Sequence, residues 1–492
     1  MPDVFAKNKP QNSTMDELTR KIYGAYETPT WIFSKIILPH IKDVLWDYLW
    51  VDLYCGSGNL ILPMLELIPE SDRVVFFEEH VFLCDILPEM VQRARYRASN
   101  YGIPPDLASK RIVVRNTFEQ YPIDIFKKSN TKIFHITNPP YLYIGYIVKN
   151  KQARFWLRYF AGLFRGLQDL YQLALAYDVV YDIDNLIYII PTNFLYGSSG
   201  ANKIRCLVFE KYLLKKVYIF EKQIFDYTGQ HVGVFFFVRK KHPSHHPQTF
   251  EVLTFSDGSF RRKTISVLPE NKYRASTIFD EFVKKYKANL PLRVRYYLFE
   301  AELIKNKGKN KIIVIDSNKY IHGKYQKRIF YVNDKIYRKI KNNILFVKTV
   351  DGIKEDDRAG LYVIRDFFDA DAIVVSRAPY RTHPIHLFLE PEIKPEQQIL
   401  LMKYFNLLLN YFRRKTGGEF LTTYKYVDKD IVRKYLGLTQ VRSLIETFPI
   451  LCLDEKEKEI FKKLIDLGDA EKVIEFIKKI KKKNKTLLTW IN

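Results

Sequence analysis

The sequence predicts an α/β fold in which a Rossmann-like sheet occupies the first half of the chain and a mixed α+β domain follows. Residues 50–60 have the pattern of a buried strand, a tight glycine turn and the start of a helix. Residues 81–85 have the pattern of a second strand that ends in an acid, with a helix opening at Pro88. A third apolar run, 132–137, leads into Asn138. Because open α/β sheets bind ligands at the carboxyl ends of their strands, these strand ends predict one binding edge.

The tetrapeptide Asn138-Pro139-Pro140-Tyr141 closes the third strand and is the most informative stretch of the chain. Its two prolines lack N–H groups and stiffen the backbone, so the Asn138 side chain and the carbonyls of Asn138 and Pro139 are held as acceptors. The Tyr141 ring then offers a flat surface beside them. A planar group with an exocyclic NH2 fits this arrangement: a flipped-out adenine or cytosine, or a carboxamide. Taken alone, the tetrapeptide is also compatible with a Pro-Pro loop and a buried tyrosine.

The glycine turn and the acid of the second strand add two further binding elements. The turn has the pattern D-x-x-C-G-S-G from Asp52 to Gly58, which differs from the G-x-G-x-x-G of dinucleotide sites. Gly56 and Gly58 let the backbone approach a ligand closely, and the helix N-terminus that follows favours a carboxylate or a phosphate. Asp85, at the tip of the second strand, is placed to bind ribose hydroxyls.

In this order and spacing, the motifs resemble the S-adenosylmethionine-dependent amino-methyltransferases. The specific resemblance is to the γ class of DNA adenine-N6 methyltransferases from restriction–modification systems. It extends over residues 20–240 and includes an N-terminal cofactor segment at 24–29 and a later core strand at 187–190. The resemblance implies a Rossmann-like methyltransferase domain, S-adenosylmethionine as cofactor, double-stranded DNA as substrate and a C-terminal target-recognition domain.

The resemblance also implies which residues bind the cofactor. The implied cofactor-binding residues are Thr28, Asp52, Cys55, Gly56, Gly58, Asp85, Asn116 and Asn138. Thr28 would lie near the methionine end. The family usually has an aspartate where this chain has Asn116, which keeps an acceptor but loses the charge. The spacing from the glycine turn to the acid is longer than usual, with 71–80 as the insertion.

The implied catalytic residues are Asn138, Pro139, Pro140, Tyr141 and Phe225. Adenine N6 is a poor nucleophile because its lone pair is delocalised into the ring. Acceptance of both its hydrogens, by Asn138 Oδ1 and the Pro139 carbonyl, would direct the lone pair at the sulfonium methyl. The base must leave the duplex to reach the site, and Tyr141 and Phe225 would stack on it.

Charge is distributed unevenly along the chain. Residues 1–240 carry 29 Lys+Arg and 24 Asp+Glu, whereas residues 241–492 carry 50 and 31, so the net charges of +5 and +19 sum to +24. A basic second half suits a module that follows phosphates, although lysine-rich composition alone also produces such a balance. We expect a methyltransferase domain over 1–243 and a DNA target-recognition domain over 244–492.

Within the second domain, apolar runs predict strands at 311–315, 344–347, 360–364 and 372–375. Three clusters interleave basic and aromatic residues, which is typical of nucleic-acid surfaces and also of ordinary solvated faces. The residues we expect to bind DNA are Lys324, Arg328, Arg377, Arg381, Arg413, Arg414 and Lys415. Residues 469–485 predict an amphipathic helix that closes the domain.

The cysteine pattern and the hydropathy of the chain bear on metal binding and on location. The four cysteines are scattered, which argues against a zinc ribbon or a disulfide framework, and we expect no metal. No apolar run approaches a membrane span, and the start of the chain does not resemble a leader, so we expect a cytoplasmic protein without membrane contact. We also expect a monomer, with any cognate restriction endonuclease on a separate chain.

Three alternatives stay open from the sequence. The same tetrapeptide serves methyltransferases that act on RNA or on a protein glutamine. A DNA-binding subunit could keep a degenerate, non-catalytic methyltransferase core. Finally, both the adenine N6 and the cytosine N4 amines suit the pair of acceptors, and the order of the motifs favours adenine.

Overall fold

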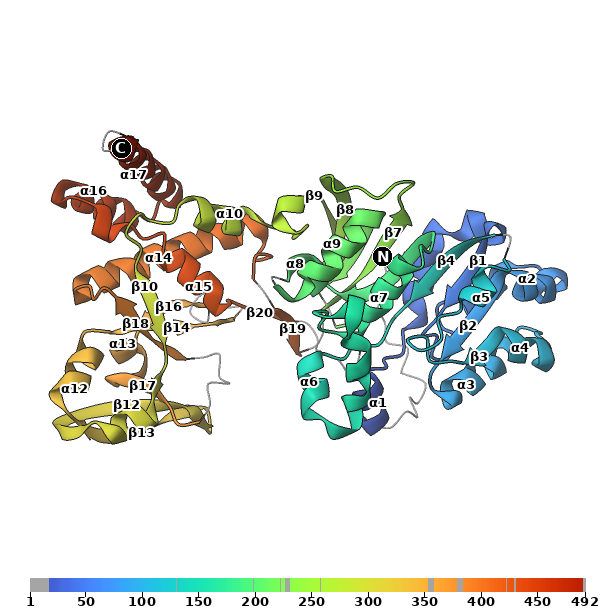
Figure 1. Ribbon diagram of the computed structural model, residues 1–492, viewed down its shortest axis with the longest axis horizontal. Helices are drawn as coiled ribbons and strands as arrows, with labels where there is room; N and C mark the ends of the chain where they lie inside the picture. Colours follow the sequence, from blue (N-terminus) through green and yellow to red (C-terminus); the bar gives the residue numbers. More distant parts are fainter. Residues whose placement is uncertain are drawn as a thin grey trace. The chain divides into compact units, whose positions relative to one another are not determined.

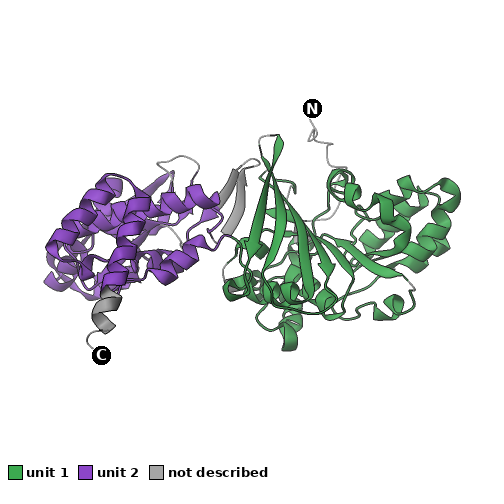
Figure 2. Ribbon diagram, turned by 90° about the horizontal axis from the view of Figure 1, so that it is seen from above, with its two compact units in different colours: residues 1–275, 426–432 green, residues 276–425, 433–492 purple. Residues whose placement is uncertain are grey.

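The computed structural model divides into two compact units, which are coloured separately in Figure 2. Unit 1 comprises residues 1–275 and 426–432, and unit 2 comprises 276–425 and 433–492. The residues that the structure describes are 17–129, 131–197, 199–221, 223–225, 231–256, 258–352, 358–377, 384–421, 423–428 and 431–489. Each unit is treated below by itself.

Unit 1 is built on a nine-stranded sheet with the order β3-β2-β1-β4-β5-β7-β6-β8-β9 (Figure 1). The strands are β1 (Tyr48–Asp52), β2 (Val81–Asp85), β3 (Ile112–Val114), β4 (Lys132–Thr137), β5 (Asn185–Pro191), β6 (Tyr212–Phe220), β7 (Val232–Arg239), β8 (Gln248–Ser256) and β9 (Ser259–Val267). β1 to β5 pair in parallel, and β7 runs antiparallel between β5 and β6. The strand order reverses between β1 and β4, which is the position where doubly wound sheets bind ligands. The predicted α/β class of the first half is confirmed.

Helices connect these strands, and α2 packs on β1 while α3 packs on β2 and β3. The α-helices are α1 (Glu17–Tyr23), α2 (Arg73–His80), α3 (Pro88–Ser99), α4 (Pro105–Arg111), α5 (Ile123–Phe126), α6 (Ile144–Lys149), α7 (Leu170–Val180), α8 (Asn193–Tyr196) and α9 (Asn202–Lys211). A π-helix spans Ile32–Ile37, and the longer 3-10 helices span Lys42–Asp47, Leu62–Leu67 and Lys151–Phe160. The insertion expected at 71–80 contains α2.

The central strands are buried because both faces of a parallel sheet are covered. Leu49, Trp50 and Val51 of β1 are at most 1% exposed, and the Trp50 ring stacks on Phe134 of β4 at 4.8 Å between centroids. This continuous apolar character is the signal that predicted these strands from the sequence.

Unit 1 continues past residue 243, where the sequence analysis placed the domain boundary. β8 pairs in parallel with β6, and β9 pairs with β8, so residues up to Ala275 belong to the same compact unit. The buried side chain of Gln248 donates hydrogen bonds to the carbonyls of Phe209 and Tyr212 and ties β8 to the sheet. The polar stretch around residue 243 is therefore a connection within this sheet.

Unit 2 mixes helices with short sheets, and all four strands predicted in the second half are present. One sheet has the order β10-β18-β14-β16, and another has the order β11-β17-β12-β13. The strands are β10 (Arg293–Tyr296), β11 (Leu298–Phe299), β12 (Lys307–Ile321), β13 (Lys324–Val332), β14 (Leu345–Lys348), β15 (Val350–Asp351), β16 (Gly360–Val363), β17 (Ala372–Val375) and β18 (Ile385–Glu390). Two further strands, β19 (Thr423–Asp428) and β20 (Ile431–Tyr435), contain residues of both units.

The α-helices of unit 2 are α10 (Ile278–Lys285), α11 (Glu300–Lys305), α12 (Asp334–Lys341), α13 (Ile364–Phe368), α14 (Pro395–Thr416), α15 (Leu438–Ile445), α16 (Glu455–Asp466) and α17 (Ala470–Thr489). The largest core of the unit contains buried residues of α10, α14, α15, α16 and α17, whereas α11, α12 and α13 pack in smaller clusters. α17 is the amphipathic helix expected near the C-terminus, and Val473 and Ile477 on its apolar face are buried with residues of α14 and α16. Among the described residues, no helix is both long and apolar enough to span a membrane.

Candidate functional site

A cavity with about 800 Å³ of empty space, including its open mouth, lies at the carboxyl ends of β1, β2 and β4. Eight of the expected site residues line it: Thr28, Asp52, Cys55, Gly56, Asp85, Asn116, Asn138 and Pro140. Gly58, Pro139, Tyr141 and Phe225 do not line it. The cavity thus brings together residues far apart in sequence, as the hydrogen bond between Asn138 and Tyr26, 112 positions apart, shows.

The two glycines of the turn have different surroundings. Both have positive φ angles, +53° at Gly56 and +82° at Gly58. A Cβ atom at Gly56 would meet no heavy atom within 4 Å, whereas one at Gly58 would lie 2.5 Å from the Leu62 Cδ1 atom. A Cβ atom on Gly56, which lines the cavity, would therefore meet open space, whereas Gly58 is needed for the turn and its packing.

The two carboxylate oxygens of Asp85 join the glycine turn to the start of α3. Its Oδ2 accepts the Gly56 N–H at 2.8 Å, and its Oδ1 accepts the Leu87 N–H at 2.9 Å. Burial raises the pKa of Asp85 from its ordinary value, and the two amide hydrogen bonds oppose that shift. The side chain lines the cavity and at the same time fixes the turn.

Asp52, at the end of β1, is 2% exposed and lines the same cavity. Its Oδ1 accepts the Tyr54 N–H at 3.1 Å. Burial raises the pKa of Asp52 to about 7, because the carboxylate form loses hydration. This carboxyl group therefore titrates close to neutral pH.

Asn138 has its carboxamide orientation fixed from both ends. Its Nδ2 donates to the Tyr26 carbonyl at 2.8 Å, and its Oδ1 accepts the hydroxyl hydrogen of Tyr141. The same hydroxyl also contacts the Ile189 carbonyl at 2.5 Å, at the end of β5. The Asn138 Oδ1 atom keeps a second lone pair, since an amide oxygen accepts two hydrogen bonds.

Tyr141 is enclosed and does not line this cavity, and stacking of its ring on a flipped base stays a prediction. The residue is 4% exposed, and its ring lies 5.9 Å from the Tyr26 ring at an interplanar angle of 25°. Burial raises the pKa of its hydroxyl well above the ordinary value. The aromatic residue of this pair that lines the cavity is Tyr26, which sequence reasoning missed although it lies inside the matched segment 24–29.

Asn116 lies at the cavity beside a second aromatic group that the sequence did not reveal. Its Nδ2 donates to the Tyr159 hydroxyl at 2.8 Å, and its Oδ1 accepts the Phe118 N–H at 3.2 Å. Trp156, from the following 3-10 helix, also lines the cavity and donates from Nε1 to the Ile22 carbonyl at 2.9 Å. No motif marks residues 151–160, so their contribution depends on the tertiary fold.

Phe225 is 3% exposed, and its carbonyl accepts a hydrogen bond from Gln223 Nε2 at 2.6 Å. It is not among the residues that line the cavity. A stacking role for Phe225 on a flipped base stays a prediction.

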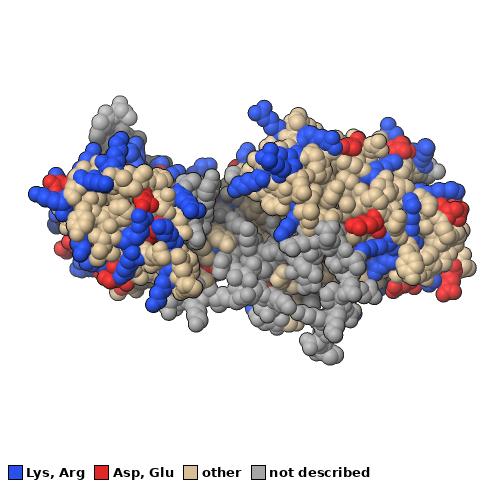
Figure 3. Space-filling view, turned by 90° about the horizontal axis from the view of Figure 1, so that it is seen from below, with Lys and Arg blue, Asp and Glu red and all other residues tan. Residues whose placement is uncertain are grey.

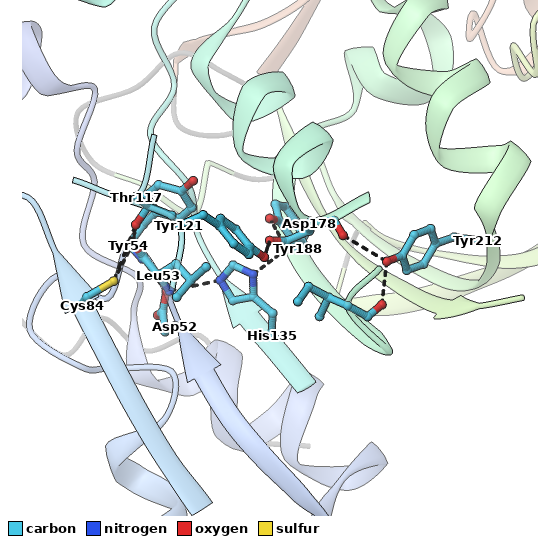
Figure 4. Close-up of polar contacts among 11 residues, drawn as sticks. Asp52, Leu53, Tyr54, Cys84, Thr117, Tyr121, His135, Asp178, Tyr188 and Tyr212 are labelled. Carbon is cyan, nitrogen blue, oxygen red and sulfur yellow. Dashed lines mark hydrogen bonds and ion pairs between the residues drawn. The ribbon is translucent and has the colours of Figure 1, made fainter. Parts of the chain in front are cut away.

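A buried polar network lies behind the cavity wall (Figure 4). His135 Nδ1 and Asp178 Oδ2 are 2.6 Å apart, and both side chains are at most 1% exposed. The hydroxyls of Tyr121 and Tyr188 donate to the same carboxylate at 2.7 and 2.6 Å. On the other side of the imidazole ring, the Leu53 N–H donates to His135 Nε2 at 3.1 Å.

In unit 2, two of the arginines expected to bind DNA are occupied by internal contacts. Arg413 pairs with Asp351 at 2.6 Å, donates to the Ala359 carbonyl, and has a side chain only 10% exposed. Arg328 pairs with Glu300 and lies over the Phe330 ring. Both guanidinium groups are therefore used within unit 2. Arg413 is no longer expected to contact DNA, and the first role of Arg328 is its internal ion pair.

The remaining expected DNA contacts are exposed where the structure describes them. They are Lys324, Arg377, Arg414 and Lys415, while Arg381 lies outside the described residues. Lys415 also lies 3.4 Å from Glu471. Lysine and arginine side chains extend over both units on the face shown in Figure 3, with acidic side chains among them.

No protein-family model matches the sequence, and no curated protein matches it. The structure does match solved structures. The Type IIL restriction-modification enzyme MmeI in complex with DNA superposes with a TM-score of 0.54 at 12% identity, covering 92% of this chain and 72% of that one. This chain shares its fold with MmeI.

Two further matches have lower scores. The type IIG restriction endonuclease BpuSI has a TM-score of 0.41 at 10% identity, covering 90% of this chain and 61% of that chain. The DrdV–DNA complex has a TM-score of 0.39 at 12% identity, covering 52% of this chain. The chain spans 31% of the length of DrdV.

Proposed function

We propose that this protein transfers a methyl group from S-adenosylmethionine to the N6 amine of an adenine in double-stranded DNA, as the modification enzyme of a restriction–modification system. The observation that carries the proposal is the shared cavity, which is lined both by the glycine turn and Asp85 and by the tetrapeptide residues Asn138 and Pro140. The fold shared with MmeI, a restriction-modification enzyme described with DNA, agrees with this assignment.

The residues that line the cavity fit the proposed cofactor in their chemistry. Gly56, whose Cβ position is open, lines the cavity together with Asp52 and Asp85. Gly56, Asp85 and Asn116 would hold the nucleoside part, and Thr28 and Asp52 the amino-acid part. When bound, S-adenosylmethionine supplies an electrophilic methyl group on a positively charged sulfur.

The chain itself contributes position and hydrogen bonding. The Tyr141 hydroxyl and the Tyr26 carbonyl orient the Asn138 carboxamide, so that the free lone pair of Oδ1 accepts one hydrogen of the target amine. The Pro139 carbonyl would accept the other. Fixed acceptors of this kind favour a pyramidal nitrogen and need no reorganisation during transfer. The methylated nitrogen is acidic and loses its proton without a strong general base.

The β12–β13 hairpin of unit 2 is the surface that we propose contacts the phosphates. Residues 307–332 hold six lysines and one arginine against a single aspartate. The hairpin turns at His322 and Gly323, both at positive φ, and Tyr320 and Tyr331 are 51% and 56% exposed. Exposed aromatic rings among lysines suit bases and phosphates together.

The proposal is tested with purified protein, labelled S-adenosylmethionine and unmethylated bacterial DNA, followed by digestion to nucleosides. We expect label in N6-methyladenine, and an Asn138→Ala protein is expected to bind the cofactor but to transfer at least about 100-fold more slowly. Label in N4-methylcytosine would correct the base. Label in RNA or protein with DNA unlabelled, or normal turnover by Asn138→Ala, would overturn the assignment.

A further inference from the structure

The peptide of Leu53 is held by side chains at both of its polar atoms. Leu53 follows the last residue of β1, and its N–H donates to His135 Nε2 at 3.1 Å. Its carbonyl accepts the Thr117 hydroxyl at 3.1 Å and lies 3.6 Å from the Cys84 sulfur. These contacts replace the regular strand ladder at the position where the chain enters the glycine turn.

The hydrogen bonds determine the tautomer of His135. Nε2 accepts the Leu53 amide hydrogen, so Nε2 carries no proton and Nδ1 carries the single ring proton. Nδ1 then donates to Asp178 Oδ2 at 2.6 Å. Asp178 therefore aligns the imidazole ring so that its acceptor faces Leu53.

Asp178 is itself fixed by donors from two further elements. Its carboxylate accepts the hydroxyls of Tyr121 and Tyr188, and the residue is fully buried. A buried carboxylate is stable only when such donors replace its hydration. Both carboxylate oxygens have partners, so the side chain has one orientation.

His135 and Asp178 do not line the cavity, but the segment they hold does. Asp52, Leu53 and Tyr54 are all part of the cavity wall. His135 also lies three residues before Asn138, on β4. The network thus joins the wall on the β1 side to the strand that carries the tetrapeptide.

We propose that His135 is a positioning residue that, aligned by Asp178, fixes the Leu53 peptide and thereby sets the affinity of the cavity for S-adenosylmethionine. The proposal rests on the proposed function, because it concerns the same cofactor. If the Leu53 amide had no acceptor, the amide would be buried without a partner, and the wall would relax toward another conformation.

Two substitutions separate the two hydrogen bonds of the ring. In His135→Gln, the side-chain oxygen can still accept from Leu53, whereas the bond to Asp178 is removed. In His135→Asn, the shorter amide can still donate to Asp178, whereas Leu53 is left without an acceptor. Both variants remove one hydrogen bond from the buried network, so we expect similar falls in melting temperature.

The test is calorimetric titration of the purified full-length protein with S-adenosylmethionine, beside thermal unfolding. We expect His135→Asn to raise the dissociation constant roughly tenfold, and His135→Gln to change it less than about threefold. His386 provides a matched control, because it is a buried histidine in unit 2 whose ring also contacts a backbone amide and a carbonyl. His386→Asn should lower the melting temperature without changing cofactor affinity.

The outcomes distinguish the inference from the function on which it rests. A wild-type protein that binds no S-adenosylmethionine would refute the proposed function. A wild-type protein that binds, with both His135 variants weakened equally or neither weakened, would overturn the positioning role. If His135→Asn does not fold, Asp178→Asn takes its place, because an amide that donates to Nδ1 leaves the ring proton on Nε2 and the Leu53 amide without an acceptor. An unchanged cofactor affinity of Asp178→Asn would also overturn the proposal.

Discussion

The backbone of Tyr141 passes so close to Gly24 that a Cβ atom on Gly24 would lie 2.6 Å from the Tyr141 carbonyl oxygen. The Tyr141 N–H also donates to the Gly24 carbonyl at 3.0 Å. The segment that carries Tyr26 and Thr28 is therefore packed directly on the tetrapeptide, backbone against backbone. Because the atoms in this contact belong to the backbone, no side chain can rotate to make room for a Cβ atom at residue 24.

Gly24→Ala should therefore destabilise unit 1 and displace the tetrapeptide. The substitution combines a φ of +64° with a backbone clash, and we expect a loss of about 3 kcal/mol of unfolding free energy together with most methyl transfer. Gly102→Ala is the matched control, because Gly102 has a φ of +84° and open space around its Cβ position. It should cost only about 1 kcal/mol. Equal losses in denaturant unfolding would contradict the role of the close approach.

Tyr141→Phe separates the hydroxyl from the ring. Phenylalanine keeps the stacked contact with Tyr26 but lacks the hydroxyl that donates to Asn138 Oδ1 and contacts the Ile189 carbonyl. We expect kcat for methyl transfer to fall by about 10- to 100-fold, because the Asn138 carboxamide loses its orienting partner, with little change in cofactor affinity. Steady-state kinetics with DNA and binding calorimetry measure the two effects. A Phe variant with unchanged kcat would show that the ring alone matters.

Gly56→Ala should mainly lower cofactor affinity, whereas Gly58→Ala should mainly lower stability. The methyl group at residue 56 would enter open space on the cavity side, so S-adenosylmethionine affinity should fall by about tenfold or more with a small loss of stability. The methyl group at residue 58 would clash with Leu62, so the melting temperature should fall further. Calorimetric titration and thermal unfolding of both variants check this. The idea fails if the cofactor affinities of the two variants are reduced equally.

Because of Asp52, the unfolding free energy should fall as pH rises towards and through 7. Its pKa is raised to about 7 in the folded protein, so between its unfolded pKa and pH 7 the folded state binds more protons than the unfolded state. The contribution of Asp52 to stability is thus present at low pH and is lost as pH rises through 7. Asp52→Asn should remove this pH-dependent loss. In the absence of cofactor at pH 8, its unfolding free energy should exceed that of the wild type by on the order of 2 kcal/mol. Denaturant titrations at pH 5 and pH 8 test the sign, and a larger advantage at pH 5 would refute it.

The lysines of the β12–β13 hairpin should determine the salt dependence of DNA binding. Replacing Lys309, Lys311 and Lys324 by Gln should reduce the slope of log affinity against log salt by about 0.9 for each phosphate that the variant no longer neutralises. Lys472→Gln is the control, because Lys472 is paired with Asp469 on the C-terminal helix. Fluorescence anisotropy across a salt series measures the slopes. An unchanged slope in the triple variant would place the DNA surface elsewhere.

Local patterns in the sequence determined the elements and their chemistry. The apolar runs predicted β1, β2 and β4, the proline at residue 88 marked the start of α3, and the two glycines marked the turn between them. Backbone propensity and burial act over a few residues, so a single sequence contains this information. The order of the strand-end motifs was enough to predict that they share one edge of a sheet.

The tertiary structure decided which groups face the cavity and which are held behind it. Enclosure of Tyr141 by Tyr26, alignment of His135 by Asp178 and neutralisation of Arg413 by Asp351 each join residues far apart in the chain. A charged or aromatic side chain looks the same in sequence whether it is exposed or paired. Only packing removes water from one of its faces, and that packing depends on partners that no local pattern specifies.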